Sequence, residues 1–553
     1  MSPFALLSLR PPRVLHASRW LRWLLVWRVV HTVIALVAVL VVLGSEAIAG
    51  PARIAALTAG VTFVLLGVTS SIALTRGRHV GRTLSLAADY LTFVGAVVTL
   101  LQTNRVFVGL DALGATFSRG VPFLLLALLA WIIGGLVAGE GRPSPAAKVL
   151  RWITWLGVVA ALIAVGILPG LGTFLARTAR PLGLALLLVG TTSWYLAWRT
   201  FQRDVGNHLR ASNRSQRTLD GLLFVSPNLL GFAVFFAGPL LFSLFVSLTE
   251  WDAFGDADFV GLGNYAKILA LNVQFLGAGE SATSALPGGY FEWFSLGSIV
   301  VGARDVMFWT SIRNIVVFTL FALPLSTIPA LFLATLLNSK APGIKVFRAI
   351  YFIPSIAGVV AVALIWRQLF SATTGWLNYL ISRAVAFVNG LPLLPEVTDP
   401  RLQWLSDADI ALFSLVIVFS WMFLGYNAVL FLAGLQGVDP TLHEAAMLDG
   451  ANRWQRFRNV TLPTLKPTTF FVVASTGILT LQLFGENVVL FPTTTPIGAG
   501  PENSTLTPVV YLYDQGFRRF AFGYASAVAW VLFVLIFLFT LIQFRRQRED
   551  VGS

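Results

Sequence analysis

Twelve long apolar segments dominate the sequence and leave little room for any structure other than membrane-spanning helices. A bilayer crossing needs roughly 20 apolar residues, because each backbone polar group must be hydrogen-bonded within its own helix. Of the 553 residues, 56% are hydrophobic and only 12% are charged, which is more apolar than a soluble domain requires. We therefore predict an all-α polytopic membrane protein with about twelve transmembrane helices. Their approximate limits are 23–43, 53–74, 84–101, 120–138, 150–168, 181–198, 222–248, 310–337, 347–370, 409–435, 468–490 and 523–544.

The distribution of Lys and Arg predicts how these segments are oriented. With the N-terminus placed in the cytoplasm, each cytoplasmic segment holds three to five Lys and Arg residues, whereas each outside loop holds one or two. This asymmetry agrees with the positive-inside rule and places both termini in the cytoplasm. The formal net charge of +14 lies in these short loops rather than on one continuous face. It therefore indicates contact with the headgroups of the lipid bilayer and argues against nucleic-acid binding.

A basic, polar linker at 201–221 divides the chain into two halves, each with six predicted spans. We predict an N-terminal transmembrane extension at 1–200, whose role could be scaffolding, lipid anchoring or docking of a partner. The second half is a core at 222–545, followed by a cytoplasmic tail at 546–553. The long outside loop 249–309 is expected to form an ordered cap or a partner surface. The loop 371–408 contains an apolar stretch that predicts a re-entrant or interfacial helix.

Several kinds of catalytic chemistry are absent from the sequence. The chain has no cysteine, which excludes disulfides, thiol catalysis and thiolate metal sites. It lacks the G-x-x-x-x-G-K-[ST] loop that cradles nucleotide phosphates, the H-E-x-x-H pair of zinc hydrolases and the nucleophile elbow. We therefore predict that the protein is not an enzyme, and that any ATP it depends on is hydrolysed by another chain.

The segment EAAMLDGANRWQRFRNVTLP, residues 444–463, lies in the predicted cytoplasmic loop 436–467. Asp439 followed by Pro440 predicts a helix start, because Asp can cap free N–H groups and Pro fits the first turn. Gly450 predicts the end of this helix, since Gly readily adopts the left-handed conformation found there. A second short helix is expected over roughly 452–459, and Pro463 interrupts its continuation. His443 is expected to be a solvated helix residue without a catalytic role.

This spacing resembles the EAA loop of permease subunits in bacterial ATP-binding-cassette importers. The core is also similar to the carbohydrate-uptake, maltose-type branch of that family, in segments that include VGLGNY (260–265), FRAIYFIPSIAGVVAVALIW (347–366) and FGYASAVAW (522–530). In that family the loop is a cytoplasmic docking helix gripped by a separate ATPase. The matching residues, which we expect to dock the ATPase, are Glu444, Ala445, Ala446, Asp449, Gly450, Leu462 and Pro463.

The resemblance also implies a substrate class, a mechanism and a set of partners. It implies a permease subunit in the bacterial inner membrane for a carbohydrate such as maltose, maltodextrin or trehalose. The expected partners are a second permease, a dimer of ATPase subunits and an extracytoplasmic solute-binding protein. ATP and Mg would be used by the ATPase, with no cofactor or metal in this chain. Compared with the maltose-type subunit, this chain has a longer N-terminal extension and a shorter outside domain.

Family substrate sites lie midway through the membrane on the helices that flank the docking loop. Sugars need aromatic faces for their C–H surfaces and amide or hydroxyl groups for their hydroxyls. The matching segments supply five candidates, namely Trp421, Tyr426, Asn427, Thr480 and Gln482. Polar groups inside a membrane are costly unless they are paired or face a wet cavity, so Asn427 and Gln482 are expected to face inward. Hydrogen bonding between helices explains the same polar residues equally well.

Two acidic residues inside predicted spans bear on the alternative functions. Asp89 is expected to form a structural pair with Arg28 or His31, with a functional site as the less favoured alternative. Glu486 is expected to be solvated near the outer interface. A secondary carrier of sugars or other small solutes would need essential membrane carboxylates and internal repeats, and no clear repeat is present. A membrane-embedded transferase would need clustered Asp, Glu or His at one membrane face. The acidic run in 249–258 has no recognisable catalytic spacing.

Overall fold

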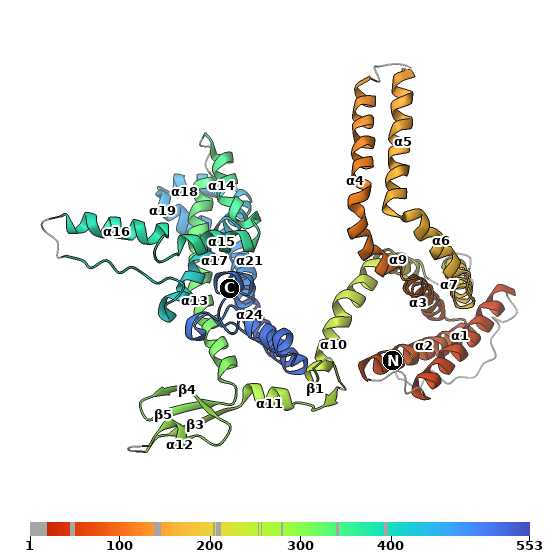
Figure 1. Cartoon of the computed structure of the whole chain (residues 1–553), viewed down its shortest axis with the longest axis horizontal. Helices are drawn as coiled ribbons and strands as arrows, with labels where there is room; N and C mark the ends of the chain where they lie inside the picture. Colours follow the sequence, from red (N-terminus) through yellow and green to blue (C-terminus); the bar gives the residue numbers. More distant parts are fainter. Residues whose placement is uncertain are drawn as a thin grey trace. The chain divides into compact units, whose positions relative to one another are not determined.

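The computed structural model describes residues 19–44, 50–137, 145–202, 205, 212–252, 254–255, 257–277, 280–338, 342–391 and 396–552. The chain forms two compact units, Met1–Phe232 and Ala233–Ser553, and helices dominate both (Figure 1). Ten helices in the described residues are long and apolar enough to cross a membrane, or eleven if one bent pair counts as a span. The all-α polytopic prediction is thereby confirmed. The predicted division at 201–221 stays a prediction.

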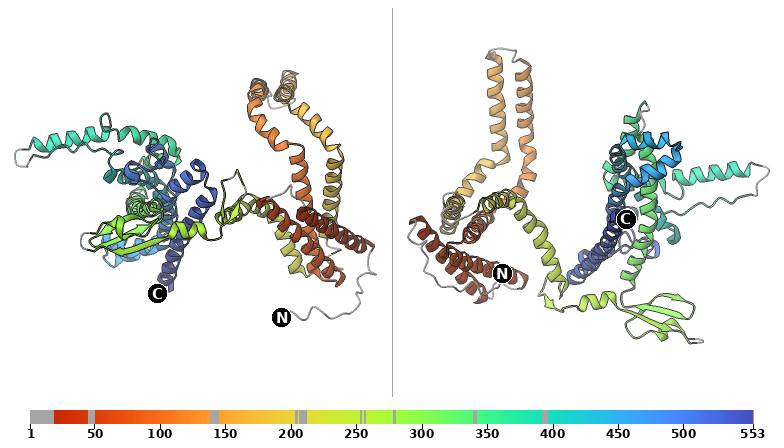
Figure 2. Two further views of the ribbon diagram at one scale, coloured as in Figure 1. Left: turned by 60° about the horizontal axis from the view of Figure 1, so that its bottom comes forward. Right: turned by 180° about the vertical axis from the view of Figure 1, so that it is seen from behind.

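Unit 1 consists of helices in two groups. Its elements are α1 (Arg19–Gly44), α2 (Gly50–Thr75), α3 (His79–Thr103), α4 (Val106–Val137), α5 (Pro145–Val165), α6 (Ile167–Thr178), α7 (Pro181–Phe201) and α9 (Asn213–Phe232). Helix α2 packs on α1 and α3, and α3 packs on α7. Helices α4 and α5 pack along each other as a long antiparallel hairpin, which the right view of Figure 2 shows side-on. A Cβ on Gly157 would lie 3.0 Å from that of Ala127, so small residues allow these backbones to approach closely.

A buried ion pair joins α1 to α3. Arg28 and Asp89 are both fully buried and pair through Nη2 and Oδ1. The indole Nε1 of Trp27 donates to the same carboxylate oxygen at 3.1 Å. One turn further along, His31 Nε2 and Thr92 Oγ1 lie 2.8 Å apart. The predicted structural pair is therefore confirmed with Arg28 as the partner.

Arg82 connects α3 to the end of α7 and to α9. Its guanidinium is almost completely buried and donates to the carbonyl oxygens of Thr200 at 2.8 Å and Phe201 at 2.6 Å. It also donates to the side-chain oxygen of Gln216 at 2.7 Å. The last carbonyl groups of a helix have no partner inside that helix. Arg82 satisfies them and attaches the first turn of α9 to the extension.

Unit 2 is built around the long helices α13 (Val306–Leu337) and α17 (Ala408–Gln436), which pack along each other. Buried aromatic rings fill this contact, with the rings of Phe318 and Phe419 5.4 Å apart. Around them lie η3 (Ala233–Ala237), α10 (Gly238–Ser247), α11 (Gly263–Leu269), α14 (Ile344–Ile356), α15 (Val359–Leu369), α16 (Trp376–Asn389), α21 (Lys466–Leu481), α22 (Gly485–Leu490), η5 (Pro501–Asn503), α23 (Pro508–Tyr513), η6 (Asp514–Arg518) and α24 (Phe522–Gly552). Helix α16 lies in the loop where a re-entrant or interfacial helix was predicted.

The loop 249–309, which we call the cap, contains a small β-structure; whether it covers the core or binds a partner stays a prediction. Strands β1 (Thr249–Glu250) and β2 (Asp258–Phe259) pair with each other. An antiparallel sheet has the order β3 (Leu271–Phe275), β5 (Ile299–Ala303) and β4 (Phe291–Leu296), beside the short helix α12 (Ala282–Ala285). Where the cap meets α13, Asp305 accepts hydrogen bonds from Phe308 N–H at 3.0 Å and from the hydroxyls of Tyr511 and Tyr524. Burial raises the pKa of Tyr511, so its hydroxyl remains a donor.

Two predicted spans are not continuous helices, which accounts for the difference from twelve. The segment 347–370 bends by 98° between α14 and α15, where Ala357 and Gly358 adopt extended conformations. The segment 468–490 breaks between α21 and α22, at Gln482–Phe484. The helices that follow the two breaks, α15 and α22, pack against each other. Sequence hydropathy detects the apolar length of these segments but not their bends.

Helix α22 also places Glu486 differently from the prediction. This residue was expected to be solvated, but it is only 6% exposed, so that expectation was wrong. The break before α22 turns the chain onto α15, and a Cβ on Gly485 would lie 3.0 Å from the Val359 side chain. The contact with α15 thus buries the segment that contains Glu486.

We expect Asp89→Asn to destabilise the chain by about 3 kcal/mol, because it leaves the buried Arg28 guanidinium without a counter-charge. The thermal unfolding of the purified full-length variant, followed by circular dichroism in detergent, measures this loss. The double variant Arg28→Met, Asp89→Leu removes both charges and should recover most of the lost stability. An Asp89→Asn variant that unfolds at the wild-type temperature would contradict a stabilising ion pair.

Candidate functional site

The loop 436–467, which we call the docking loop, forms a compact helix–turn–helix between α17 and α21. Helix α18 (Pro440–Leu448) begins where the Asp439 carboxylate accepts the N–H of Thr441 at 2.9 Å. It ends before Gly450, whose φ of +78° is the left-handed conformation that the sequence predicted. Both predicted boundaries of this helix are confirmed.

A second cap begins the return segment of the docking loop. Asn452 and Gln455 form a reciprocal capping box, with N···O distances of 2.8 and 2.9 Å. The chain then passes through α19 (Arg453–Arg456), the π-helical turn η4 (Phe457–Thr461) and α20 (Leu462–Thr464). Thr461 and Leu465 are buried, and Leu465 belongs to the core around α13 and α17. The docking loop is therefore fixed at both ends and by its own caps.

Helix α18 presents most of its side chains to the outside of the chain. None of its residues is buried, and Leu448 is 89% exposed, with Leu442 and Met447 about half exposed. Exposed aliphatic side chains on a well-ordered helix are typical of a surface that a partner covers. Among the residues predicted to dock, Glu444, Ala445, Asp449, Gly450 and Pro463 are exposed, whereas Ala446 and Leu462 are partly covered.

His443 occupies a different environment from the expected one. It is half-buried and lines a cavity of about 290 Å³ together with Arg453, Arg456 and the ends of α13 and α17. His443 is therefore partly rather than fully solvated, and its lack of a catalytic role stays a prediction. The residue pattern of the docking loop predicts that His443 lies on a helix. It does not predict that the end of α13 lies beside that helix, because α13 is distant in the sequence.

The structure does not bring the five predicted substrate residues onto one surface. Asn427 is fully buried: its Nδ2 donates to the Ser326 carbonyl oxygen at 3.2 Å, and its Oδ1 accepts from Thr476 Oγ1 at 3.0 Å. It thus ties α17 to α13 and α21, which matches the alternative of hydrogen bonding between helices. Thr480 is also buried and donates to the Gly477 carbonyl oxygen within α21.

The remaining substrate candidates are more accessible. Trp421 is 45% exposed and packs edge-on against Trp366, with ring centres 5.6 Å apart. Gln482 is exposed at the break after α21, and Tyr426 is partly buried. Their substrate role stays a prediction, and Trp421 and Gln482 are the candidates that a ligand could reach without rearrangement.

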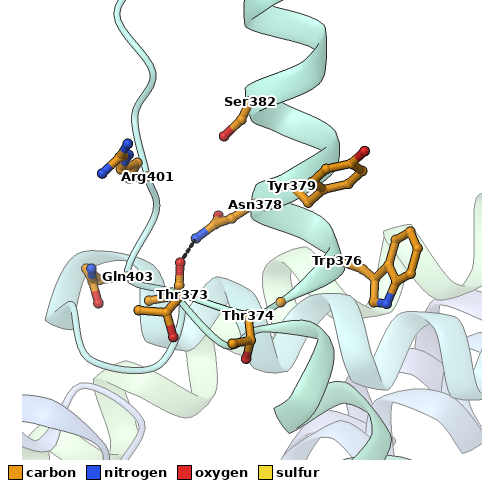
Figure 3. Close-up of a pocket in the computed structure, with 10 residues that line it drawn as sticks. Thr373, Thr374, Trp376, Asn378, Tyr379, Ser382, Arg401 and Gln403 are labelled. Carbon is orange, nitrogen blue, oxygen red and sulfur yellow. Dashed lines mark hydrogen bonds between the residues drawn. The ribbon is translucent and has the colours of Figure 1, made fainter.

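A groove between α16 and the irregular segment 396–404, lined by polar and aromatic residues, is a site that the sequence did not indicate. It has a volume of about 800 Å³ (Figure 3). Asn378 holds the two sides together, with Nδ2 donating to the carbonyl oxygens of Ala372 at 3.0 Å and Leu402 at 2.9 Å. Figure 3 shows Ser382, Arg401 and Gln403 around the groove, whose lining also includes Trp376 and Tyr379 of α16. Hydroxyl, amide and guanidinium groups suit a polar ligand.

Metal chemistry has no obvious location within the described residues. No group of three or more His, Cys, Asp or Glu side chains gathers there in a way that could hold a metal ion.

Comparisons with known proteins relate the chain to transport components. Residues 315–548, all within unit 2, match the family described as "Binding-protein-dependent transport system inner membrane component". The probable ABC transporter permease protein YesP of Bacillus subtilis is 32% identical over 351 residues, which cover 62% of this chain and 95% of that protein. The lactose transport system permease protein LacF of Rhizobium radiobacter is 30% identical over 342 residues, covering 62% and 98%. The arabinooligosaccharides permease protein AraP of Bacillus subtilis is 30% identical over 332 residues, covering 60% and 89%.

We expect Asp439→Ala to loosen α18 without unfolding the docking loop, because the first turn loses its cap. Hydrogen–deuterium exchange of residues 440–448, measured by mass spectrometry, should become about fivefold faster. Asp439→Asn is the matched control, since its amide oxygen can accept the same hydrogen bond. Equal exchange in the wild type and in Asp439→Ala would show that the cap does not stabilise the helix.

The cap should also give α18 a defined pH dependence. Hydrogen bonds from the backbone N–H and the side chain of Thr441 lower the pKa of Asp439. Its stabilisation is therefore complete above the ordinary pKa of about 4 and is lost as the pH falls through the lowered value. At each pH, exchange in the wild type should be compared with exchange in Asp439→Asn. The wild type should lose its protection relative to that variant only in acid.

Proposed function

Since the chain belongs to the family of binding-protein-dependent transport system inner membrane components, we propose that it is a permease subunit of an ATP-driven carbohydrate importer. Family members are transport components of the membrane and not enzymes, so catalysis of ATP hydrolysis is assigned to a partner. The observation that carries the proposal is the docking loop, in which a helix capped at both ends exposes Glu444 and Leu448.

The geometry of the docking loop suits the grip of an ATPase. Ala445 is exposed and Ala446 is partly covered, so a partner backbone can approach this part of α18 closely. Glu444 offers one carboxylate, and the exposed Leu442, Met447 and Leu448 offer about one turn of apolar surface. A buried apolar centre with a charged group at its edge is the usual anatomy of a specific protein interface. In this proposal the docking loop faces the cytoplasm.

A di- or oligosaccharide is the substrate class that we favour. The relatives include permeases named for lactose and for arabinooligosaccharides. The aromatic ring of Trp421 and the amide of Gln482 are accessible groups of the kinds that bind sugar faces and hydroxyls. Maltose, maltodextrin and trehalose belong to the same chemical class and are suitable substrates to test first.

Transport by this subunit would follow from coupling between the partner and the helices around the docking loop. ATP binding would close a dimer of ATPase subunits and move α18. Because α17 and α21 enter and leave the docking loop and are linked through Asn427 and Thr476, they would move with it. A second permease would complete the path, and an extracytoplasmic binding protein would deliver the sugar. Alternating access by movement of packed helices needs no catalytic group in this chain.

Glu444→Lys should abolish or strongly weaken ATPase association, because it places a positive charge where the partner is expected to offer Arg or Lys. Co-purification of the ATPase with the membrane-inserted variant measures the effect. Glu396→Lys reverses an exposed charge in the loop after α16 and should leave association unchanged. Normal ATPase recovery with Glu444→Lys would remove the docking assignment.

Gln482→Ala should slow uptake of the transported sugar at low concentration about fivefold, the effect of one neutral hydrogen bond. ATPase co-purification should be unaffected, which separates substrate binding from docking. Gln368→Ala removes another exposed glutamine amide, on α15, and is the matched control. Uptake that falls equally in both variants would argue against a specific role for Gln482.

A further inference from the structure

The cavity beside His443 combines basic side chains from the docking loop with the ends of two core helices. Its volume is about 290 Å³. His443, Arg453 and Arg456 come from the docking loop, and Thr335 and Asn338 come from the end of α13. Leu435 and Val438, both 8% exposed, form an apolar part of the wall. The cavity therefore has a polar, basic side and an apolar side.

The positive charge in this cavity has no counter-charge in the described part of the chain. No carboxylate lines the cavity. Among the described residues, neither Arg453 nor Arg456 has a carboxylate oxygen within 4.0 Å of its guanidinium nitrogens. The Nε of Arg456 is buried and has no hydrogen-bond partner among the described residues. A buried donor that remains unsatisfied costs free energy, more so when it belongs to a charged group. The cavity thus has the properties of a site that an anion would complete.

Geometry and size narrow the class of anion. A guanidinium presents several N–H donors in a plane and pairs well with the oxygens of a phosphate. A second guanidinium, an imidazole and the side chains of Thr335 and Asn338 could contact further oxygens. About 290 Å³ is enough for a phosphate monoester and too small for a dinucleotide.

We propose that this basic cavity binds a phosphate group, carried by an anionic lipid headgroup or by a small soluble phosphate ester. The bound group bridges Arg456 of the docking loop and the end of α13. It thereby holds the return segment of the docking loop against the core helices. This goes beyond the transport function, since binding requires neither the ATPase nor a sugar.

Binding is tested on the purified full-length chain with two probes. Inorganic phosphate, radiolabelled, is measured by equilibrium dialysis in lipid-free neutral detergent. Phosphatidylglycerol is measured by native mass spectrometry of protein taken from nanodiscs that also contain phosphatidylcholine. Arg456→Gln removes the guanidinium with the buried donor. Arg458→Gln is the matched control, because Arg458 is exposed two residues further on and does not line the cavity.

We expect one phosphate-containing ligand per chain, bound about tenfold more weakly by Arg456→Gln and within about twofold of wild type by Arg458→Gln. Hydrogen–deuterium exchange over 453–461 should slow in the wild type when the ligand is present. Phosphate binding in detergent identifies a soluble ligand, and retention of phosphatidylglycerol without competition by phosphate identifies a lipid. The proposal is overturned if the wild type binds neither probe, or if Arg456→Gln binds as wild type. Equal loss in both variants would also overturn it, because that indicates general surface charge.

Discussion

The need to hydrogen-bond every backbone group inside the membrane governs the core of unit 2, because two of its apolar segments are broken helices. Such breaks are tolerated only where other protein groups supply the missing partners. At the second break, Thr507 Oγ1 donates to the Leu483 carbonyl oxygen at 2.9 Å, and Asn487 Nδ2 donates to the Thr505 carbonyl oxygen at 2.6 Å. The segment 498–507 is thus held against α22, and α22 against α15. The bends, the buried Glu486 and the exposed Gln482 all follow from this arrangement.

The docking loop is ordered by a different means, since its polar caps work in water. Its connection to the rest of the chain is nevertheless rigid. Helices α17 and α21 are joined across Asn427 and Thr476, and a Cβ on Gly434 would lie 2.5 Å from the Thr468 hydroxyl oxygen. A helix that is stiff, exposed and fixed to two packed core helices can pass on a displacement, whereas a mobile loop would absorb it.

The sequence predicts those features that depend on neighbours along the chain. Asp439 and Gly450 mark the ends of α18 because capping and left-handed turns are local effects. The pairing of Asp89 is also predictable, since a charge inside a membrane helix needs a partner. The bend at Gly358 is not, because Gly and Pro are common in membrane helices that remain straight. The environment of His443 and the groove around Asn378 depend on segments distant in sequence, which hydropathy does not bring together.

One glycine in α17 has a consequence for how this protein can evolve. A Cβ on Gly425 would lie 1.8 Å from the carbonyl oxygen of Tyr351, so α14 and α17 touch backbone to backbone at that point. Any missense mutation of the Gly425 codon would force the two helices apart. The exposed arginines of the docking loop have no backbone packed against them in this way. Substitutions at these positions are therefore tolerated unless a partner or a ligand depends on the arginine. Natural variation should therefore be nearly absent at position 425, even among descendants that have changed their substrate.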